Sequence, residues 1–119
     1  MEHFYFDHNA TTPLAPEVRD VYLRALDQVY GNPSSVHYFG QAAKRQLEQA
    51  RRQVAELIHA DAAEVVFTSG GTEANTMALR GVEAERILVS AVEHPSVLAA
   101  ARASGKAVEI IPVDREGRI

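Results

Sequence analysis

Two adjacent glycines and a threonine, Gly70, Gly71 and Thr72, stand where a β-rich run gives way to a helical pattern. A helix start presents unpaired backbone N–H groups and the positive end of the helix dipole, so it attracts anions. Glycine lets an anion approach the backbone, and the Thr72 hydroxyl adds a donor. The stretch lacks the lysine of the nucleotide P-loop and the GxGxxG spacing of dinucleotide sites. The pattern favours a small phosphorylated ligand, provided that the Glu73 side chain points away; a tight turn with a helix cap is the alternative.

A histidine follows the next apolar run, in the stretch SAVEHPSV at residues 90–97. Ligands of open α/β sheets bind beyond the carboxyl ends of the strands, so we expect His94 on the same edge as Gly71 and Thr72. An imidazole there can stack on a flat heteroaromatic ring and exchange protons near neutral pH. A lone histidine can equally be a surface or capping residue. Together with a phosphate site, this histidine suggests pyridoxal 5′-phosphate as the cofactor.

The elements that must position these residues follow from periodicity and turn residues. Apolar spacing predicts helices over residues 16–29, 40–58, 74–81 and 95–104, and β-rich runs predict strands over residues 65–67, 86–90 and 108–113. Alternating strands and helices with short connections are typical of a parallel sheet. We therefore predict an α/β fold with a partial, mainly parallel sheet and crossover helices. Residues 1–15 are expected to form an extended segment and residues 16–119 an incomplete major domain, the front part of something longer.

Composition narrows the classes of function. The chain has 119 residues, 46% of them apolar and 24% charged, which is the mix of a soluble globular protein. Its net charge is −4 and no stretch is basic, which argues against nucleic acid as a partner. No apolar run is long enough for a membrane span, and the acidic start MEHFYFDH is unlike a secretory signal, so we expect a cytoplasmic protein. The absence of cysteine excludes disulfides, thiolate metal ligands and a thiol nucleophile within this chain.

Five ordered blocks give the chain a family resemblance: FDHNATTP at 6–13, GNPSSVHYFG at 31–40, VAELIHA at 54–60, VVFTSGGTEAN at 65–75 and VEHPSVL at 92–98. The chain resembles the N-terminal part of the class V aminotransferase superfamily, and within it the cysteine desulfurases of the NifS/IscS type. The resemblance implies a fold type I enzyme that depends on pyridoxal 5′-phosphate and is normally a homodimer. Such an enzyme converts L-cysteine to L-alanine and holds the sulfur as a persulfide. A sulfur-acceptor protein then receives it, for iron–sulfur cluster assembly or other sulfur transfer.

The resemblance also implies roles for particular residues. Gly71 and Thr72 would hold the cofactor phosphate. His94 would be the catalytic residue of this segment, stacking on the pyridine ring and assisting proton transfer. No metal ligand is implied. Four further residues would lie near the active-site entrance: Asn9, Ala10, Thr11 and Thr12.

The chain departs from the family in what it lacks. Such an enzyme needs a lysine for the Schiff base and a cysteine to accept sulfur. The only lysines, Lys44 and Lys106, are predicted on a polar helix face and in a turn, outside the Ser-His-Lys setting of the family. Asp114 is interpreted as a turn residue rather than the acidic partner of the pyridine nitrogen. His59 replaces the glycine that usually ends the helix, so it must be left-handed or the cap must move.

Three functions are therefore compatible with the sequence. The first is a cysteine desulfurase segment, inactive alone, whose remaining groups come from outside these residues. The second is another class V lyase or aminotransferase, such as a selenocysteine lyase. The third is a non-catalytic interaction module. A downstream reading frame with Ser-His-Lys and a later cysteine would favour the first, and a true stop after residue 119 would favour the third.

Overall fold

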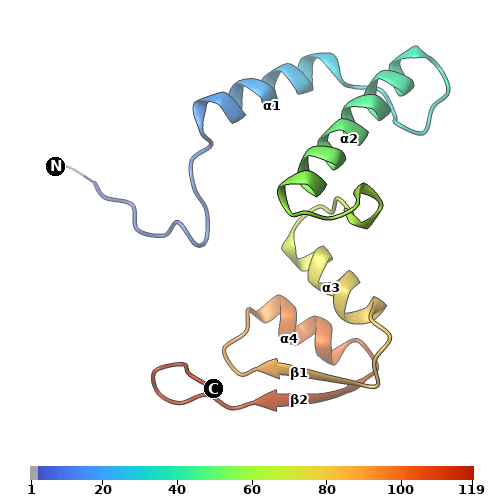
Figure 1. Ribbon diagram of the computed structural model, residues 1–119. Helices are drawn as coiled ribbons and strands as arrows, with labels where there is room; N and C mark the ends of the chain where they lie inside the picture. The colour runs from blue at the N-terminus through green and yellow to red at the C-terminus, as the bar shows by residue number, and fades with distance from the viewer. Residues whose placement is uncertain (1–2) are drawn as a thin grey trace. The chain divides into compact units, whose positions relative to one another are not determined.

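The structure, a computed structural model, describes residues 3–119, which divide into two compact units between Val65 and Val66 (Figure 1). The first unit is helical, and the second combines two helices with two parallel strands. The predicted α/β fold with a partial parallel sheet is confirmed. The predicted boundary after residue 15 stays a prediction. Within residues 3–119, no helix combines the length and the apolar character that crossing a membrane requires.

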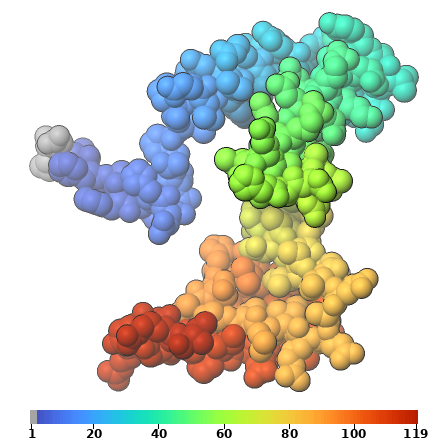
Figure 2. All heavy atoms as spheres, viewed as in Figure 1, coloured from blue at the N-terminus to red at the C-terminus, as the bar shows by residue number. Residues whose placement is uncertain are grey.

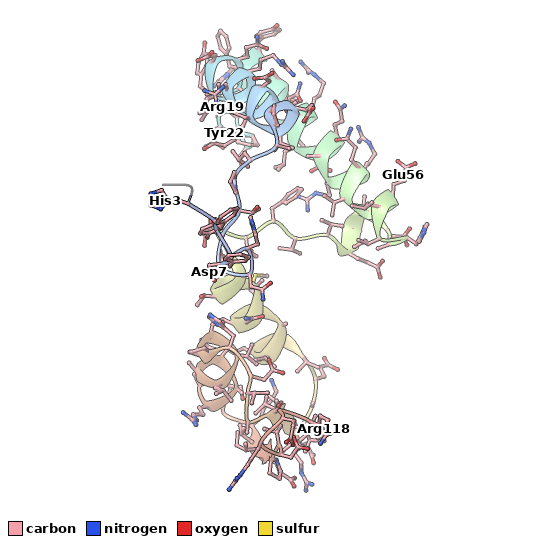
Figure 3. All side chains as sticks on the ribbon, turned by 90° about the vertical axis from the view of Figure 1, so that its left-hand side faces the viewer. His3, Asp7, Arg19, Tyr22, Glu56 and Arg118 are labelled. Carbon is pink, nitrogen blue, oxygen red and sulfur yellow. The ribbon has the colours of Figure 1, made fainter. Side chains whose placement is uncertain are left out.

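The first helix, α1 (Pro16–Gln28), starts with a proline at its first turn, where the missing N–H costs little. None of its residues is buried, and Figure 2 shows its spheres largely uncovered on the side that faces the viewer. Its apolar side chains recur at helical spacing, as predicted. The larger ones, of which Figure 3 labels Tyr22, are each at least 42% exposed: Val18, Val21, Tyr22, Leu23 and Leu26.

The packing of the preceding loop on the start of α2 (Tyr38–Leu57) depends on two glycines, Gly31 in the loop and Gly40 in the first turn of the helix. A Cβ at Gly31 would lie 2.2 Å from the carbonyl oxygen of Phe39, and a Cβ at Gly40 would lie 2.4 Å from that of Ser35. Both distances are too short for any side chain, so the backbone of this loop packs directly on the start of the helix. His37 completes the start, because its Nδ1 accepts the backbone N–H of Gly40 at 3.3 Å.

The C-terminal end of α2 is a Schellman motif. The N–H of Ala60 donates to the carbonyl of Ala55 at 2.9 Å, and the N–H of His59 donates to the carbonyl of Glu56 at 3.3 Å. His59 has a φ of 55°, so it occupies the left-handed position that usually belongs to glycine. Of the two alternatives that the sequence left open, the structure has the left-handed histidine, and the cap keeps its ordinary place.

The second unit is built around β1 (Arg86–Ser90) and β2 (Ala107–Ile111), which pair in parallel with Arg86 opposite Ala107. The helix α4 (Pro95–Arg102) connects the strands, and α3 (Gly71–Gly81) precedes β1 (Figure 1). One face of the sheet is covered, because Ile87 and Val89 are buried against Ala101 of α4. Leu88 points to the other face and is 59% exposed. Partly buried apolar residues complete this small core: Leu79, Val97, Leu98 and Val108.

The prediction of a third strand at residues 65–67 is wrong. These residues belong to no strand, although Val65 has extended dihedral angles of −89° and 121°. A strand exists only when its N–H and C=O groups pair with a neighbour, and β1 and β2 pair with each other alone among the described residues. Before this run the chain forms a short 3₁₀-helix, η1 (Ala62–Glu64), which the sequence analysis did not anticipate. Its capping box includes a 2.8 Å bond from the N–H of Asp61 to the carboxylate of Glu64.

Candidate functional site

The N-terminus of α3 keeps its backbone donors available. Gly70 is the N-cap residue in an extended conformation, and no side chain caps the helix. The first bond of the helix runs from the N–H of Ala74 to the carbonyl of Gly70, at 3.1 Å. Among residues 3–119, no group accepts from the N–H of Gly71 or Thr72. These donors and the dipole of α3 make this end of the helix attractive to an anion.

The two glycines at this end differ from Gly31 and Gly40 at the start of α2. A Cβ at Gly70 or Gly71 would meet no atom within 4 Å, whereas one at Gly31 would collide with backbone. Packing within the described residues therefore does not require glycine at positions 70 and 71. No described atom crowds the backbone on the side where these Cβ atoms would lie, which leaves room there for a phosphate to approach. The residues present therefore fit a phosphate group.

Glu73 is held away from these donors. Its Oε2 accepts from the hydroxyl of Ser69 at 2.7 Å and from the backbone N–H of Ser69 at 2.6 Å. These bonds, the one from the hydroxyl first, lower the pKa of the Glu73 carboxyl from its ordinary value of 4.5. The carboxylate is thus engaged one residue before the cap rather than on the N–H groups of Gly71 and Thr72.

His94 stands at the start of α4, four residues beyond the end of β1, and is its N-cap residue. Its Nδ1 accepts the backbone N–H of Ser96 at 3.1 Å and lies 2.8 Å from the Ser96 hydroxyl. That hydroxyl also lies 2.9 Å from Nδ2 of Asn75, which belongs to α3. Thr72 and Asn75 are three residues apart, so they share one side of α3. The structure therefore brings the phosphate-binding candidates and His94 to one corner of the second unit. His94 is a capping residue, and through Ser96 and Asn75 it is connected to the helix that bears the phosphate-binding candidates.

The four residues predicted at the active-site entrance belong to the first unit and lie in or directly after the turn that follows Asp7, which Figure 3 labels. The carbonyl of Asp7 accepts the N–H groups of Ala10 and Thr11 at 3.1 and 3.2 Å. Thr12 Oγ1 lies 3.1 Å from Nδ1 of His8, and Asn9 is exposed at the tip of the turn. Because the phosphate-binding candidates belong to the second unit, a site shared by the two groups stays a prediction.

Lys106 forms hydrogen bonds at the C-terminal end of α3, opposite the end that carries Gly71 and Thr72. Its Nζ donates to the carbonyls of Leu79 and Arg80, at 2.9 Å each. A cation at the C-terminus of a helix satisfies free carbonyls and interacts favourably with the dipole. With 11 residues in α3 and a rise of about 1.5 Å per residue, this amine lies about 15 Å along the helix from Gly71. Lys106 therefore caps the C-terminal end of α3 and lies far from the candidate phosphate-binding residues.

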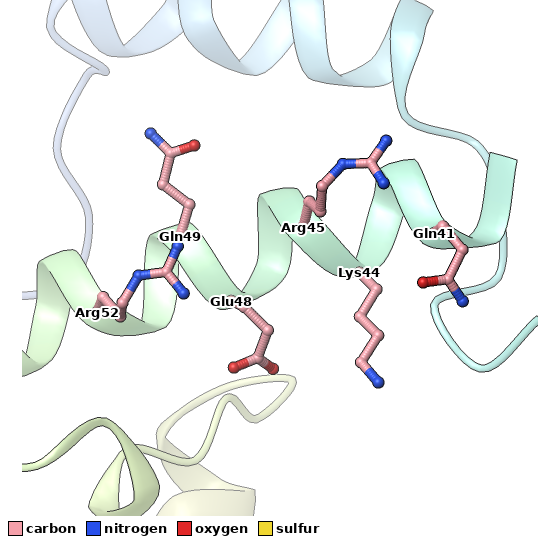
Figure 4. A pocket seen from close by; sticks show the side chains of 6 residues that line it. All are labelled: Gln41, Lys44, Arg45, Glu48, Gln49 and Arg52. Atoms are coloured by element: carbon pink, nitrogen blue, oxygen red, sulfur yellow. The ribbon is translucent and has the colours of Figure 1, made fainter. Parts of the chain in front are cut away.

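Lys44 projects from the polar face of α2, as predicted (Figure 4). A shallow hollow of about 410 Å³ runs along this face. Side chains of α2 alone line it: Gln41, Lys44, Arg45, Glu48, Gln49 and Arg52. Because one helix alone supplies these charged and polar side chains, the hollow is part of a solvated helix surface and not an enclosed binding pocket.

Asp114 is a turn residue, as predicted. Its carboxylate accepts from the backbone N–H groups of Glu116 and Arg118 at 2.9 Å each, and from the Arg118 guanidinium at 3.0 Å. These bonds, led by the backbone N–H of Arg118, lower the pKa of the Asp114 carboxyl from its ordinary value of 3.8. The Asp114 carboxylate therefore stabilises its own turn through these hydrogen bonds.

The second unit combines a two-stranded parallel sheet, a glycine-rich helix start and a histidine-capped helix, and comparison with known proteins gives the class of the chain. The family model described as Aminotransferase class-V matches residues 4–119. The chain belongs to the class V aminotransferase family. Its relatives include a cysteine desulfurase of Cereibacter sphaeroides, 49% identical over all of this chain and 33% of the relative. Another is the cysteine desulfurase IscS of Dictyoglomus turgidum, 42% identical over 95% of this chain and 31% of the relative.

A solved structure supports the same class. A NifS-like protein matches with a TM-score of 0.72 and 30% identity, over 89% of this chain and 32% of that one. The chain thus spans about a third of the length of the cysteine desulfurases that it matches. Its resemblance to the N-terminal part of these proteins is confirmed.

Sequence reasoning missed two polar residues of the site, Asn75 and Ser96. Both stand inside the blocks TSGGTEAN and EHPSV that carried the resemblance, but neither received a role there. The available signal was spacing, because Asn75 follows Thr72 by three residues on one helix and Ser96 follows His94 by two at a helix start. Their contact across 21 residues could not be deduced from spacing alone.

Proposed function

We propose that this chain supplies the phosphate-binding and ring-stacking part of a cysteine desulfurase that depends on pyridoxal 5′-phosphate. In this proposal residues 16–119 belong to an incomplete major domain, preceded by the extended residues 1–15. The substrate is L-cysteine, and the sulfur passes to an acceptor protein. The complete protein is expected to be a homodimer.

One observation carries the proposal. The side chains of Asn75, Ser96 and His94 form a continuous chain of short contacts from α3 to α4. This chain ties the imidazole to the same side of α3 that bears Thr72, one turn from the free N–H groups of the helix start. A ligand with a phosphate at one end and a flat ring at the other matches that arrangement. The membership of the class V aminotransferase family supports the same cofactor.

Each residue has a defined task in this proposal. The N–H groups of Gly71 and Thr72 and the Thr72 hydroxyl bind the phosphate, whose charge the dipole of α3 stabilises. His94 lies against one face of the ring and orients it. Pyridoxal 5′-phosphate, when bound, supplies the electron sink that weakens bonds of the substrate amino acid. Within residues 1–119, Lys106 is a helix cap and there is no thiol. The amine that binds the cofactor aldehyde and the thiol that accepts sulfur must therefore come from outside these residues.

The direct test is a chimera in which this chain replaces the matching third of the cysteine desulfurase of Cereibacter sphaeroides. We expect the chimera to bind the cofactor and to release sulfide from L-cysteine, whereas the 119-residue chain alone releases none beyond the slow reaction of the free cofactor. A folded chimera without bound cofactor would refute the proposal. Sulfide release at enzymatic rates by the isolated chain would also contradict it.

The phosphate assignment has its own variant. Thr72→Ala removes one hydrogen bond to a charged group, worth about 1.5–3 kcal/mol. The affinity of the chimera for the cofactor should therefore fall roughly tenfold to more than a hundredfold. Thr76→Ala is the matched control, because its hydroxyl donates at 2.8 Å to the Thr72 carbonyl inside the helix and not to the site. Equal affinity in the two variants would remove Thr72 from the phosphate site.

A further inference from the structure

The backbone N–H of Ser96 determines which atom donates and which accepts in each hydrogen bond around His94. A histidine nitrogen, a hydroxyl and an amide can each be reversed without a visible change of heavy atoms. The backbone N–H of Ser96 cannot be reversed, and it points at Nδ1 of His94 at 3.1 Å. Nδ1 is therefore an acceptor and carries no proton. In the neutral ring the proton must then be on Nε2.

The rest of the chain of contacts follows from this first step. Because Nδ1 is an acceptor, the Ser96 hydroxyl, 2.8 Å away, donates its proton to Nδ1. The Ser96 oxygen is then left as an acceptor, so the atom of Asn75 that lies 2.9 Å from it must be the amide nitrogen. The backbone N–H of Ser96 thus determines the donor and the acceptor of each contact. The hydrogen bonds run from the Asn75 amide to the Ser96 hydroxyl and from there to the imidazole.

We propose that Asn75 and Ser96 are positioning residues, which fix the ring of His94 against α3 and keep its proton on Nε2. Nothing among residues 3–119 accepts that Nε2 proton, so the imidazole offers it outward from the start of α4. Asn75 and Ser96 are half-buried, whereas His94 is exposed. The two supporting side chains are therefore shielded, while the ring that they orient is open to a ligand.

This geometry restricts what His94 can do. In its neutral state His94 donates a hydrogen bond through Nε2 and cannot accept a proton there. A proton could be accepted only at Nδ1, and that would break the bonds from the Ser96 N–H and hydroxyl. His94 is therefore a fixed ring and a hydrogen-bond donor, not a general base acting through Nε2. What its Nε2 faces rests on the proposed function, but the direction of the hydrogen bonds does not.

The test is the ¹⁵N spectrum of the imidazole nitrogens in the 119-residue chain, labelled at histidine and free of cofactor. It is recorded at about pH 8.5, where an ordinary histidine is neutral. His94→Gln identifies the resonances by their loss. We expect an unprotonated, doubly hydrogen-bonded Nδ1 and a protonated Nε2. A protonated Nδ1 would overturn the inference.

Three variants test the supporting residues. Ser96→Ala removes the hydroxyl donor but keeps the backbone N–H, so the Nδ1 resonance should move downfield, and Ser96→Thr should restore it. Asn75→Asp has nearly the same shape but can only accept, so it should draw the hydroxyl proton away and shift Nδ1 in the same direction as Ser96→Ala. Far-UV circular dichroism checks that each variant is folded, and the same label in the chimera serves for any variant that is not. An Nδ1 resonance that ignores Ser96→Ala and Asn75→Asp would refute the positioning role.

The chimera separates this inference from the proposed function. If it binds pyridoxal 5′-phosphate, Ser96→Ala should alter the visible circular dichroism of the bound cofactor, and Ser96→Thr should restore it. An unaltered cofactor spectrum in Ser96→Ala would contradict positioning of the ring. If the parent chimera binds no cofactor, the proposed function fails, while the ¹⁵N result on the free chain still decides the direction of the hydrogen bonds.

Discussion

Replacing His59 by glycine should stabilise the first unit. His59 has a φ of 55° in the Schellman motif that ends α2, and a residue with a Cβ costs about 1–2 kcal/mol in that conformation. Glycine removes this cost, but it loses more backbone entropy on folding, about 0.5–1 kcal/mol. The net gain for His59→Gly is therefore about 0.5–1 kcal/mol. Because 1 kcal/mol shifts the melting temperature of a small domain by about 4–8 °C, the expected rise is about 2–8 °C.

The assay is thermal and urea unfolding followed by the helical signal in circular dichroism. The control is His59→Ala, which removes the imidazole but keeps a Cβ, and it should leave stability within about 0.5 kcal/mol of the parent. His59 is exposed and contributes only backbone bonds to the motif, so loss of its ring should cost little. If His59→Gly were no more stable than His59→Ala, the strain attributed to the left-handed histidine would not exist.

Three further predictions concern single positions. Gly31→Ala places a Cβ 2.2 Å from a carbonyl oxygen and should destabilise the chain by about 1–3 kcal/mol in urea, whereas Gly81→Ala, whose Cβ meets nothing within 4 Å, should cause no loss. Lys106→Met keeps the alkyl chain but removes the cation from the end of α3, and should cost about 1 kcal/mol; unchanged unfolding would mean that its two bonds are absent in solution. Ser69→Ala should raise the pKa of Glu73 toward 4.5, and NMR titration measures this change. The lowered pKa of Glu73 in the folded chain adds stability above pH 4.5, and this stability is lost as the pH falls through the folded value. The stability of the variant should therefore depend less on pH in that range.

Local sequence determined most of the secondary structure. The helices at residues 16–28, 38–57, 71–81 and 95–102 and the strands at 86–90 and 107–111 lie within a few residues of their predicted places. These elements follow from apolar periodicity and from prolines and glycines at their ends, which act within a few residues. The turn at Asp114 was predictable for the same reason, whereas the sequence left two alternatives for His59, a left-handed conformation or a moved cap. The resemblance to the class V aminotransferases also required only ordered local blocks.

The tertiary structure decided what depends on a partner far along the chain. Residues 65–67 have the composition of a strand, but β1 and β2 pair with each other and leave this run without a partner. Lys106 is predicted in a turn from the sequence, and only the fold of the second unit brings its amine to carbonyls 26 and 27 residues earlier. The contact of Asn75 with Ser96 likewise joins two helices across 21 residues. Sequence periodicity carries no information about such pairs, because a hydrogen bond between distant residues depends on how the intervening elements fold back on one another.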